Sequence, residues 1–357
     1  MKKIVIGLGF GDEGKGLVVD WLASMNPKSQ VVRYSGGHQV GHCVRFNGDT
    51  HIFSNFGSGT MRGLQTIWNA KTCDPVAFCK EYKDIKQYGP VIKINPLCAI
   101  TTPFEKITNI KSESVNNHGS IGCGFGATIQ REDDNYHLYF QDVFYTQLML
   151  AKLDGIEKYY SRQNVFISKE QRKDFIESCH KMSKLTDKSI GRGEIQIYES
   201  SQGLMLDMDY GIFPNVTRSK VGTQEIDLTP DDEIYLVTRA YQTRHGNGWC
   251  SRHGFKPNAP NETNKENEFQ GEFRTRLLDL DLINYAMTID RGVRTHKNVN
   301  LVITCLDHMN NYALTNKEER KDFSCEESFV DYIIDNIPQF SKCFVSHGPT
   351  ASDISEY

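Results

Sequence analysis

The sequence predicts an α/β fold: one large P-loop-like domain whose central, mostly parallel sheet is flanked by helices and by helical and loop insertions. Short apolar runs with β-branched residues alternate with longer polar stretches of helical composition. The first apolar run, residues 4–6, leads through a glycine-rich loop into an amphipathic run at residues 17–22. This order of strand, glycine-rich loop and helix is typical of a phosphate-binding unit.

The expected strands are short, and polar, turn-rich segments follow them. These segments are of interest because open α/β sheets bind ligands at the carboxyl ends of their strands. Residues 147–190 are helical in pattern and highly charged, which indicates a solvent-facing insertion within a single domain of residues 1–357. The strands are expected at residues 3–7, 31–34, 66–68, 91–94, 195–198, 234–238 and 301–304.

The composition is that of an ordinary globular protein and does not exclude small anionic ligands. Of its 357 residues, 38% are hydrophobic and 24% are charged, as in ordinary globular proteins. The net charge of -4 argues against nucleic acid as the main partner, because proteins that bind the phosphate backbone usually carry a basic surplus. No apolar run reaches the length of a membrane span. The first residues show no charged segment followed by an apolar one, so secretion is not expected. The ten cysteines form no C-x-x-C pair, so reduced thiols and a cytoplasmic location are expected.

Residues 7–16 read G-L-G-F-G-D-E-G-K-G and contain the phosphate-loop pattern G-x-x-x-x-G-K. In such a loop, backbone N–H groups and a helix N-terminus cradle phosphates, and a lysine, here Lys15, adds a positive charge. Gly16 replaces the Ser or Thr that normally ligates Mg²⁺, and Asp12 is the obvious substitute. A carboxylate repels phosphate unless a Mg²⁺ separates them or the carboxylate serves as a base. Asp12 is therefore predicted to take part in chemistry, although a plain tight turn is the alternative.

A second informative segment, residues 33–42, reads R-Y-S-G-G-H-Q-V-G-H directly after a strand. A Gly-Gly turn followed by two histidines suits a loop that approaches a ligand closely and offers it an imidazole. His38 and His42 are four residues apart, as zinc ligands on a helix are, but the surrounding glycines disfavour a helix here.

Together, the two segments resemble the adenylosuccinate synthetase family, whose members carry W-G-D-E-G-K-G-K and R-Y-x-G-G-H-N-A-G-H loops. Further motifs match in the same order over most of the chain, which is more specific than any single motif. They are residues 48–59, similar to N-G-x-x-x-x-x-H-x-x-P-S-G with Gly57 for the proline; 199–207, similar to E-G-A-Q-G-x-x-L-D; 211–217, similar to G-T-Y-P-Y-V-T; 240–248, similar to A-Y-S-T-R-V-G-A-G-P; and 346–349, similar to S-x-G-P.

The resemblance implies a carbon–nitrogen ligase that joins L-aspartate to the 6-position of a purine nucleotide. The γ-phosphate of a nucleoside triphosphate first goes to O6 of the purine, and the aspartate amine then displaces it. Asp12 is expected to take the proton from N1, while His42 and Lys15 stabilise charge on the transferring phosphoryl group. Mg²⁺ is the implied cofactor, with Asp12 and the backbone carbonyl of Gly41 as its ligands.

The donor site departs from the family pattern where the base binds. Most members carry T-K-L-D, whose aspartate accepts hydrogen bonds from guanine and whose lysine packs on the ring. Here residues 304–307 read T-C-L-D, which favours ATP or dATP over GTP, while Asp307 is still able to accept from the amino group of adenine. The implied donor-binding residues are Gly11, Asp12, Glu13, Gly14, Lys15, Gly16, Leu17, Gly41, His42, Cys43, Cys305, Asp307, Ser346, Gly348 and Pro349.

The acceptor and aspartate sites depart as well. Gln39 replaces a usual Asn, residues 120–124 read S-I-G-C-G in place of T-T-G-x-G, and residues 269–276 replace the family's T-T-G-R-x-R-R loop. Arginines in that loop are suited to clamping carboxylates, but two surface arginines are the plain alternative. The implied acceptor-binding residues are Asp12, Lys15, Gln39, Ser120, Ile121, Gln202, Thr217, Arg244, His245 and Gly246, and the aspartate-binding residues are Gly271, Arg274, Thr275 and Arg276.

A bacteriophage branch of the family shares the compact chain, the lost lysine and the altered aspartate loop. Its members convert dGMP instead of IMP, with ATP or dATP, into N6-succino-2-amino-2′-deoxyadenylate on the route to 2-aminoadenine DNA. Some phage members carry Ser where this chain keeps Asp12, as host-type enzymes do. The leading hypothesis is the phage-type enzyme, working in the host cytoplasm if phage-encoded. The alternatives are an ordinary synthetase acting on IMP with GTP and a non-catalytic nucleotide-binding regulator.

The resemblance also implies a homodimer, in which an arginine from the partner subunit reaches the acceptor phosphate. Arg131 is the nearest candidate, although its spacing from Gly126 differs from the family pattern. The expected partners are thus small molecules, namely dGMP or IMP, L-aspartate, and ATP, dATP or GTP, together with a second copy of the chain.

Overall fold

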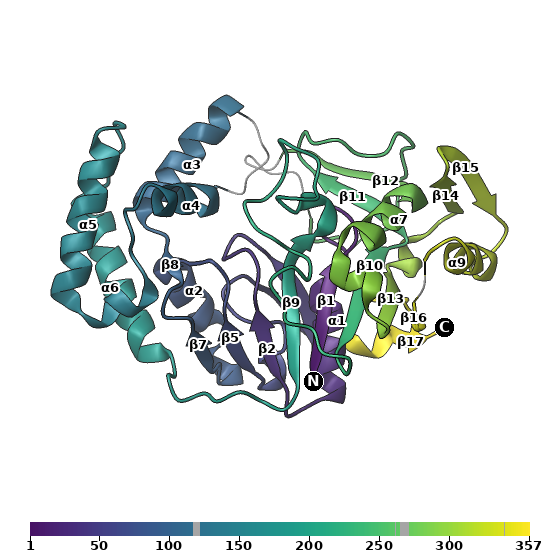
Figure 1. Ribbon diagram of the computed structural model, residues 1–357, viewed down its shortest axis with the longest axis horizontal. Coiled ribbons are helices and arrows are strands. Elements are labelled where there is room, and N and C mark those ends of the chain that lie inside the picture. Colours follow the sequence, from purple (N-terminus) through teal and green to yellow (C-terminus); the bar gives the residue numbers. More distant parts are fainter. Residues whose placement is uncertain (117–121, 261, 265–270, 339) are drawn as a thin grey trace.

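A nine-stranded sheet runs through the centre of the protein and positions the loops of the predicted site (Figure 1). The computed structural model describes residues 1–116, 122–260, 262–264, 271–338 and 340–357. The strand order is β17-β16-β13-β10-β1-β9-β2-β5-β7, and neighbouring strands are parallel except β16 and β17. The strands expected from the sequence all lie in this sheet, which confirms the α/β prediction. They and their neighbours are β1 (Lys2–Gly7), β2 (Gln30–Arg33), β5 (Gln65–Trp68), β7 (Ile92–Ile94), β9 (Gln196–Gly203), β10 (Glu233–Arg239), β13 (Val299–Thr304), β16 (Lys342–Ser346) and β17 (Ile354–Glu356).

Both faces of β1 are buried, as is usual for a parallel sheet covered by helices. Val5 packs with α1 (Lys15–Met25) on one face. Ile4 and Ile6 point to the other face, which is covered by α7 (Leu280–Ile289), α8 (Arg291–Thr295) and α9 (Glu326–Asp335). Because side chains of a strand alternate between faces, this run of apolar residues contributes to both cores.

A second sheet stands over the carboxyl end of β10. Its strand order is β11-β12-β14-β15, with β11 antiparallel to β12. Since β11 starts two residues after β10 ends, the chain turns from the central sheet directly into this one. Its strands are β11 (Tyr241–His245), β12 (Phe273–Asp279), β14 (Tyr312–Asn316) and β15 (Glu319–Phe323).

Two strand pairs and six short 3-10 turns connect the larger elements. The hairpin of β3 (His42–Phe46) and β4 (Asp49–Phe53) lies beside α1, while β6 (Thr72–Cys73) and β8 (Ala99–Ile100) pair near the helical region. The turns are η1 (Thr60–Arg62), η2 (Lys86–Tyr88), η3 (Phe140–Phe144), η4 (Leu204–Leu206), η5 (Leu306–His308) and η6 (Ala351–Asp353).

Five helices of the described chain, α2 to α6, form a region at the β7 edge of the sheet (Figure 1). Two of them occupy the segment predicted to be a charged helical insertion, and their buried faces share one apolar core with α2. None of the helices that the structure describes is long and apolar enough to cross a membrane. The helices are α2 (Pro75–Ile85), α3 (Pro103–Asn116), α4 (Phe125–Asp133), α5 (Thr146–Ser161) and α6 (Lys169–Leu185).

Arg131 on α4 corrects one expectation. Its side chain is completely buried, and its Nε donates to Glu105 Oε1 at 2.6 Å while its Nη2 donates to the Ile100 carbonyl at 2.7 Å. A further ion pair joins Nη1 to Glu132. All the contacts of this guanidinium named above are inside its own subunit, so it is not free to bind a ligand of a second subunit. The arginine expected from a partner subunit is therefore not Arg131.

Candidate active site

The phosphate-type loop lies at the carboxyl end of β1, as predicted, and turns directly into α1. Gly11 and Gly14 have φ angles of 92° and 91°, which glycine adopts without strain. A β-carbon at Gly11 would lie 2.7 Å from Gln202 Oε1, and one at Gly16 would lie 2.9 Å from the Cys43 carbonyl oxygen. The loop therefore touches both the end of β9 and the start of β3, and Gly16 leaves no room for the usual Ser or Thr.

Glu13 uses its side chain to hold the loop. Its Oε1 accepts from the backbone N–H groups of Gly9 at 3.1 Å and Gly11 at 2.7 Å, and its Oε2 lies 2.7 Å from Lys15 Nζ. Both charged side chains are buried. The carboxylate thus neutralises Lys15 and occupies two loop amides, so the predicted contribution of Glu13 to a donor nucleotide would come from its backbone.

His42 is oriented by Glu199, a residue that the sequence analysis did not single out as functional. His42 Nδ1 lies 2.5 Å from Glu199 Oε1, and its Nε2 lies 3.3 Å from the Ser201 carbonyl oxygen. Ser58 donates to the same carboxylate through both its hydroxyl and its backbone N–H. Burial lowers the pKa of His42, and Glu199 opposes this shift. The only signal in the sequence was that Glu199 opens the matched 199–207 segment.

The carboxylate of Glu199 stays ionised although it is completely buried. Burial alone would raise its pKa, but the nearby Arg33 guanidinium, His42 and the Ser58 hydroxyl hold the pKa at about 2. A negative charge fixed behind His42 favours the tautomer with a proton on Nδ1. The Nε2 atom is then the nitrogen that remains for other chemistry.

His38 has a structural role instead of a ligand role. Its Nδ1 lies 3.1 Å from Thr72 Oγ1 and its Nε2 lies 3.1 Å from the Cys123 carbonyl oxygen. Both ring nitrogens are therefore occupied within the protein, and the two histidines of the 33–42 segment are not a metal-binding pair.

Asp12 lies between the central sheet and β11. Its backbone has φ 61°, its carbonyl accepts from Arg239 Nε, and its Oδ2 lies 3.4 Å from His245 Nε2. Burial raises the pKa of Asp12, while His245 and Arg239 oppose the shift. The raised pKa brings the carboxyl group closer to the range in which a base works near neutral pH.

The T-C-L-D segment adjoins the loop. Thr304 Oγ1 donates to the Glu13 carbonyl at 2.8 Å, and Cys305, with φ 63°, is the N-cap residue directly before η5. At the end of the neighbouring strand β16, Ser346 Oγ donates to the Gly348 carbonyl at 2.8 Å. Asp307 keeps a side chain that is 35% exposed. The fold thus brings three of the predicted donor segments to the carboxyl ends of β1, β13 and β16.

Arg239 links this region to the loop and was also missed from the sequence. Its Nη1 lies 2.6 Å from Tyr241 Oη and 2.6 Å from Glu262 Oε2, while the Tyr241 hydroxyl lies 2.9 Å from His308 Nδ1. Because Arg239 Nε also binds the Asp12 carbonyl, one side chain connects the loop with residues 262–264 and with η5. No motif pointed to it, since its contacts to Asp12 and Glu262 join residues that are distant in sequence.

On the acceptor side, Gln39 has an uncommitted amide. Its Nε2 and Oε1 are both buried, and neither makes a hydrogen bond within the described part of the chain. Such groups are costly unless a ligand or water satisfies them. Gln202 lies beside Gly11. Thr217 is half-buried, and its backbone N–H donates to the carbonyl of Leu206. Ser120 and Ile121, also predicted for this site, lie outside the described residues.

The arginines of β11 and β12 differ in their hydrogen-bond partners. Arg274 donates to the carbonyls of Gly246 and Gly248, so it holds the turn after β11 instead of presenting a free fork to a carboxylate. Arg276 donates to the carbonyl of Thr275. Arg244 stacks on Phe10 and is buried, with its Nε and Nη1 lacking hydrogen-bond partners in the described residues. Burial and the neighbouring Arg274 lower the pKa of Arg244 to about 10.

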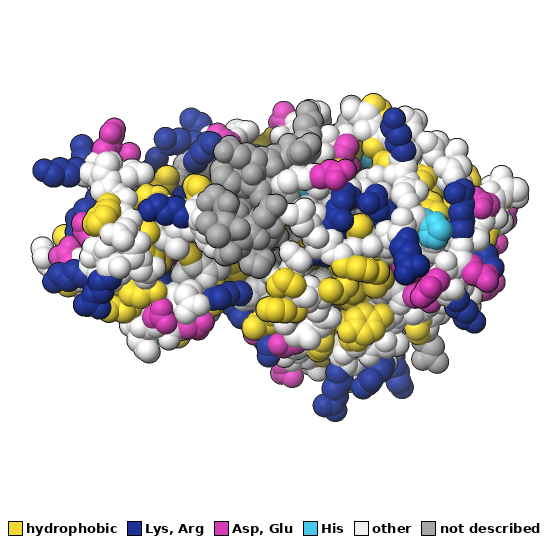
Figure 2. Space-filling view, turned by 90° about the horizontal axis from the view of Figure 1, so that it is seen from above, with side chains coloured by type: hydrophobic (Ala, Val, Ile, Leu, Met, Phe, Trp, Pro, Cys, Tyr) yellow, Lys and Arg dark blue, Asp and Glu magenta, His cyan; other side chains and the backbone are white. Residues whose placement is uncertain are grey.

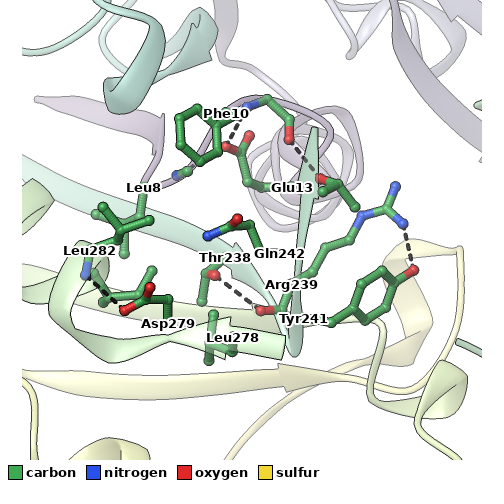
Figure 3. A pocket seen from close by; sticks show the side chains of 14 residues that line it. Leu8, Phe10, Glu13, Thr238, Arg239, Tyr241, Gln242, Leu278, Asp279 and Leu282 are labelled. Carbon is green, nitrogen blue, oxygen red and sulfur yellow. Dashed lines mark hydrogen bonds between the residues drawn. The ribbon is translucent and has the colours of Figure 1, made fainter. Parts of the chain in front are cut away.

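A small enclosed cavity lies behind the loop (Figure 3). Its volume is about 20 Å³, and its lining includes Phe10, Glu13, Thr238 and Gln242. That space suits a single water molecule and is far too small for a nucleotide. Figure 2 shows the molecule from above, a face on which Lys and Arg side chains lie beside exposed hydrophobic side chains.

Among the described residues, no group of three or more His, Cys, Asp or Glu side chains forms a ready metal site. Mg²⁺, however, commonly binds through one or two carboxylates together with substrate phosphates and waters. Asp12, in a loop that also carries buried Lys15, fits that limited requirement.

Comparison with protein families decides the origin of these motifs. The sequence model described as adenylosuccinate synthetase matches residues 4–314, which is most of the chain. The chain belongs to the adenylosuccinate synthetase family. The match spans the loop, the His42 segment and the T-C-L-D segment, so the resemblance seen in the motifs is confirmed.

Curated relatives carry the same family name. The adenylosuccinate synthetase of Blochmanniella pennsylvanica is 29% identical over 277 residues, covering 69% of this chain and 63% of the relative. That of Histophilus somni is 27% identical over 338 residues, covering 87% and 77%. The chain thus matches only about two thirds of the length of several longer synthetases.

Solved structures share the fold at low identity. The fully ligated adenylosuccinate synthetase from Plasmodium falciparum superposes with a TM-score of 0.80 and 15% identity, covering 99% of each chain. The cyanophage S-2L succinoaminodeoxyadenylate synthetase, bound to dGMP and dATP, gives a TM-score of 0.68 and 14% identity, covering 99% of this chain and 95% of that one. Both likenesses support the α/β architecture of the family.

Proposed function

We propose that the protein is a ligase that joins L-aspartate to C6 of a purine nucleotide, with dGMP as the acceptor and ATP or dATP as the donor. Its products would be N6-succino-2-amino-2′-deoxyadenylate, ADP or dADP, and phosphate. The observation that carries the proposal is the arrangement of Asp12 and Lys15 in a glycine-rich loop with His42 held by a buried carboxylate nearby.

In the proposed reaction, the purine O6 attacks the γ-phosphorus of the donor while Asp12 accepts the proton from N1. In its doubly protonated form, which the ionised Glu199 supports, His42 donates a hydrogen bond from Nε2 toward the transferring group, and Lys15 and the free loop amides balance the charge of that group. The amine of aspartate then attacks C6, and phosphate leaves with the electrons of the C6–O bond. Bound Mg²⁺, held by Asp12 and the Gly41 carbonyl, would supply charge neutralisation on the phosphates.

The adenine donor is favoured by Cys305. In the family pattern a lysine packs on guanine at this position, and a cysteine supplies neither its length nor its charge. Cys305 lies next to Thr304, which binds the loop, so the altered residue adjoins the proposed phosphate site. Asp307 remains partly exposed and is able to accept from an exocyclic amine.

The contacts to the acceptor and to aspartate are proposed from the family motifs and from the geometry of the site. Gln39, with a buried and uncommitted amide, is proposed to bind the acceptor with Gln202 and Thr217. Arg274 and Arg276 remain proposed contacts of aspartate, which requires Arg274 to exchange its backbone carbonyls for a carboxylate. A homodimer is proposed from family membership, with an arginine other than Arg131 at the acceptor phosphate.

A second candidate function is ordinary adenylosuccinate synthesis from IMP with GTP. Asp12 favours it, because some phage-type members have Ser at this position whereas host-type members keep Asp. The two reactions share the fold and chemistry and differ only in pocket contacts, which a few substitutions change.

The test is phosphate release by the purified protein with Mg²⁺ and aspartate, crossing dGMP, GMP and IMP with ATP, dATP and GTP. Selective turnover of dGMP with an adenine donor is expected. Turnover of IMP with GTP would replace the leading proposal by the second candidate. No turnover with any pair, despite measurable nucleotide binding, would leave a non-catalytic nucleotide-binding regulator.

A further inference from the structure

His245 contacts Asp12, although the family pattern has an apolar residue at its position. In the A-Y-S-T-R-V-G pattern the residue after the arginine is valine, and here it is His245. Its Nε2 lies 3.4 Å from Asp12 Oδ2, and its ring packs on Phe273 of β12 at a centroid distance of 4.8 Å. The aromatic contact fixes the imidazole, so the approach to Asp12 is built into the β11–β12 pair.

The second ring nitrogen of His245 is not used in the contact with Asp12. This nitrogen, Nδ1, is buried and makes no hydrogen bond within the described residues. A buried N–H without a partner is costly, whereas a buried acceptor without a donor is tolerated more readily. The favoured tautomer of His245 therefore carries its proton on Nε2, the nitrogen that lies 3.4 Å from Asp12 Oδ2. Hydrogen bonds in active sites are often long without substrate and tighten when it binds.

The strand order relates His42 and His245 to opposite sides of β1, the strand that leads to Asp12. Asp12 follows β1, which β9 and β10 flank on its two sides (Figure 1). His42 is bound to Glu199 and Ser201 of β9, whereas His245 belongs to β11, the continuation of β10. The order across the site is thus His42, Asp12, His245.

The edge of a purine has a matching order: O6, then N1, then the substituent at C2. In the proposed function His42 serves O6 and Asp12 serves N1, which leaves the C2 substituent on the side of His245. We propose that His245 makes the acceptor site selective for purine nucleotides that carry an amino group at C2. This inference rests on the proposed function and adds the residue that selects the acceptor.

The chemistry depends on the two oxygens of Asp12. An ionised carboxylate offers about four lone-pair sites, so Oδ2 is able to accept from His245 and from a second donor at once. With Nε2–H holding Oδ2, the carboxylate plane presents one oxygen to N1–H and the other to the amino group at C2. Hypoxanthine has only hydrogen at C2 and offers Oδ2 nothing, and valine at position 245 offers it nothing either.

The experiment compares kcat/KM for dGMP with kcat/KM for dIMP, which lacks the amino group, in the full-length protein. The variants are His245→Val, which restores the family residue, and His245→Gln, whose amide N–H replaces Nε2–H. His180→Val on α6, outside the site, is the control. A bidentate contact is worth about 1–3 kcal/mol of discrimination, so His245→Val should lower the dGMP to dIMP ratio roughly tenfold or more. His245→Gln should restore most of the ratio.

Two outcomes would overturn the inference. An equal loss of activity toward dGMP and dIMP in His245→Val would mean that His245 only supports the fold, as would a failure of His245→Gln to restore the ratio while the protein stays folded by circular dichroism. If wild-type protein turns over neither acceptor, the proposed function itself fails. If it turns over dGMP and His245→Val leaves the ratio unchanged, only the role of His245 fails.

Discussion

Asp12 has an unfavourable backbone conformation and is held in it by contacts to neighbouring side chains. Its φ of 61° is uncommon for a residue with a side chain, and such positions cost of order 1 kcal/mol or more. Contacts from Arg239 to its carbonyl and from His245 to its carboxylate hold it there. Strain that several neighbours maintain is typical of residues whose side chain has a task in the site.

Asp12→Asn is expected to lower kcat by a factor of about 10³, because it removes the base while keeping the side-chain shape. The unfolding midpoint in denaturant should change little. Steady-state phosphate release and a denaturation curve on the same preparation measure both quantities. Near-normal turnover would remove Asp12 from the mechanism.

Glu199 makes stability depend on pH in a predictable direction. Its pKa is about 2 in the folded protein against an ordinary value of 4.5. Because folding lowers this pKa, Glu199 stabilises the protein fully above about pH 4.5, and the contribution is lost as the pH falls toward 2. At about 1.4 kcal/mol per pKa unit, the effect is of order 3 kcal/mol.

Denaturant unfolding of wild type and Glu199→Gln, from about pH 6 to about pH 3, tests this sign. The variant should be less stable near neutral pH, and the difference between the two should shrink in acid. A difference that stays constant with pH would show that Glu199 is not the ionised partner of His42. Turnover of the variant should also fall, since His42 loses its orienting carboxylate.

At the scale of elements, the loop between β1 and α1 is fixed by its neighbours as much as by its own glycines. Glu13 fills two of its amides, Gln202 of β9 lies against Gly11, and Thr304 of β13 binds its backbone. The loop is therefore a rigid junction of three strands, which is what a phosphate cradle needs for preorganised electrostatics.

Gly11→Ala is expected to reduce kcat and to cost about 1–3 kcal/mol of stability. The added β-carbon meets both a φ of 92° and Gln202 Oε1 at 2.7 Å. Gly48→Ala is the matched control, since Gly48 has φ 87° and nothing within 4 Å of an added β-carbon. Equal effects of the two substitutions on activity would argue against a tight contact between the loop and β9.

The turn at η5 decides the donor in the proposed function. Cys305→Lys restores the residue of the family pattern and is expected to raise the ratio of kcat/KM for GTP to that for ATP about tenfold. Cys325→Lys, an exposed cysteine at the start of α9, is the control for the added charge. An unchanged ratio would place the donor base away from Cys305.

At the scale of the whole molecule, a buried ion pair between α3 and α4 stabilises the helical region at the β7 edge of the sheet. Arg131 and Glu105 are both completely buried. Removing one partner of such a pair leaves an uncompensated charge in the interior. The region therefore depends for its stability on the residue that the motif resemblance made the nearest candidate for a subunit contact.

Arg131→Met is expected to lower the free energy of unfolding by about 3–5 kcal/mol. The molar mass in solution, measured by light scattering, should not change. Arg162→Met, at an exposed position after α5, should affect neither quantity. A change in mass without a loss of stability would return Arg131 to a subunit interface.

Local patterns in the chain were enough to predict seven of the nine strands of the central sheet, the loop with Asp12 and Lys15, and the family. These patterns are β-branched apolar runs, glycines at fixed spacing and contiguous motifs. The sequence also pointed to His42. It gave no warning that Glu199 and Ser58 orient His42, or that Arg239 ties Glu262 to the loop.

The roles of Glu199, Ser58 and Arg239 depend on the folded arrangement. Each involves groups that lie far apart in the chain and meet at strand ends. Glu199 reaches His42 across 157 positions, and Arg239 reaches Asp12 across 227. The hydrogen-bond partners of Arg131 and Arg274 could not be predicted from the sequence either. An arginine in a motif reads the same whether its guanidinium binds a ligand or groups of its own chain. Which charges are buried and which partners satisfy them is settled by packing, and packing is not a local property of the sequence.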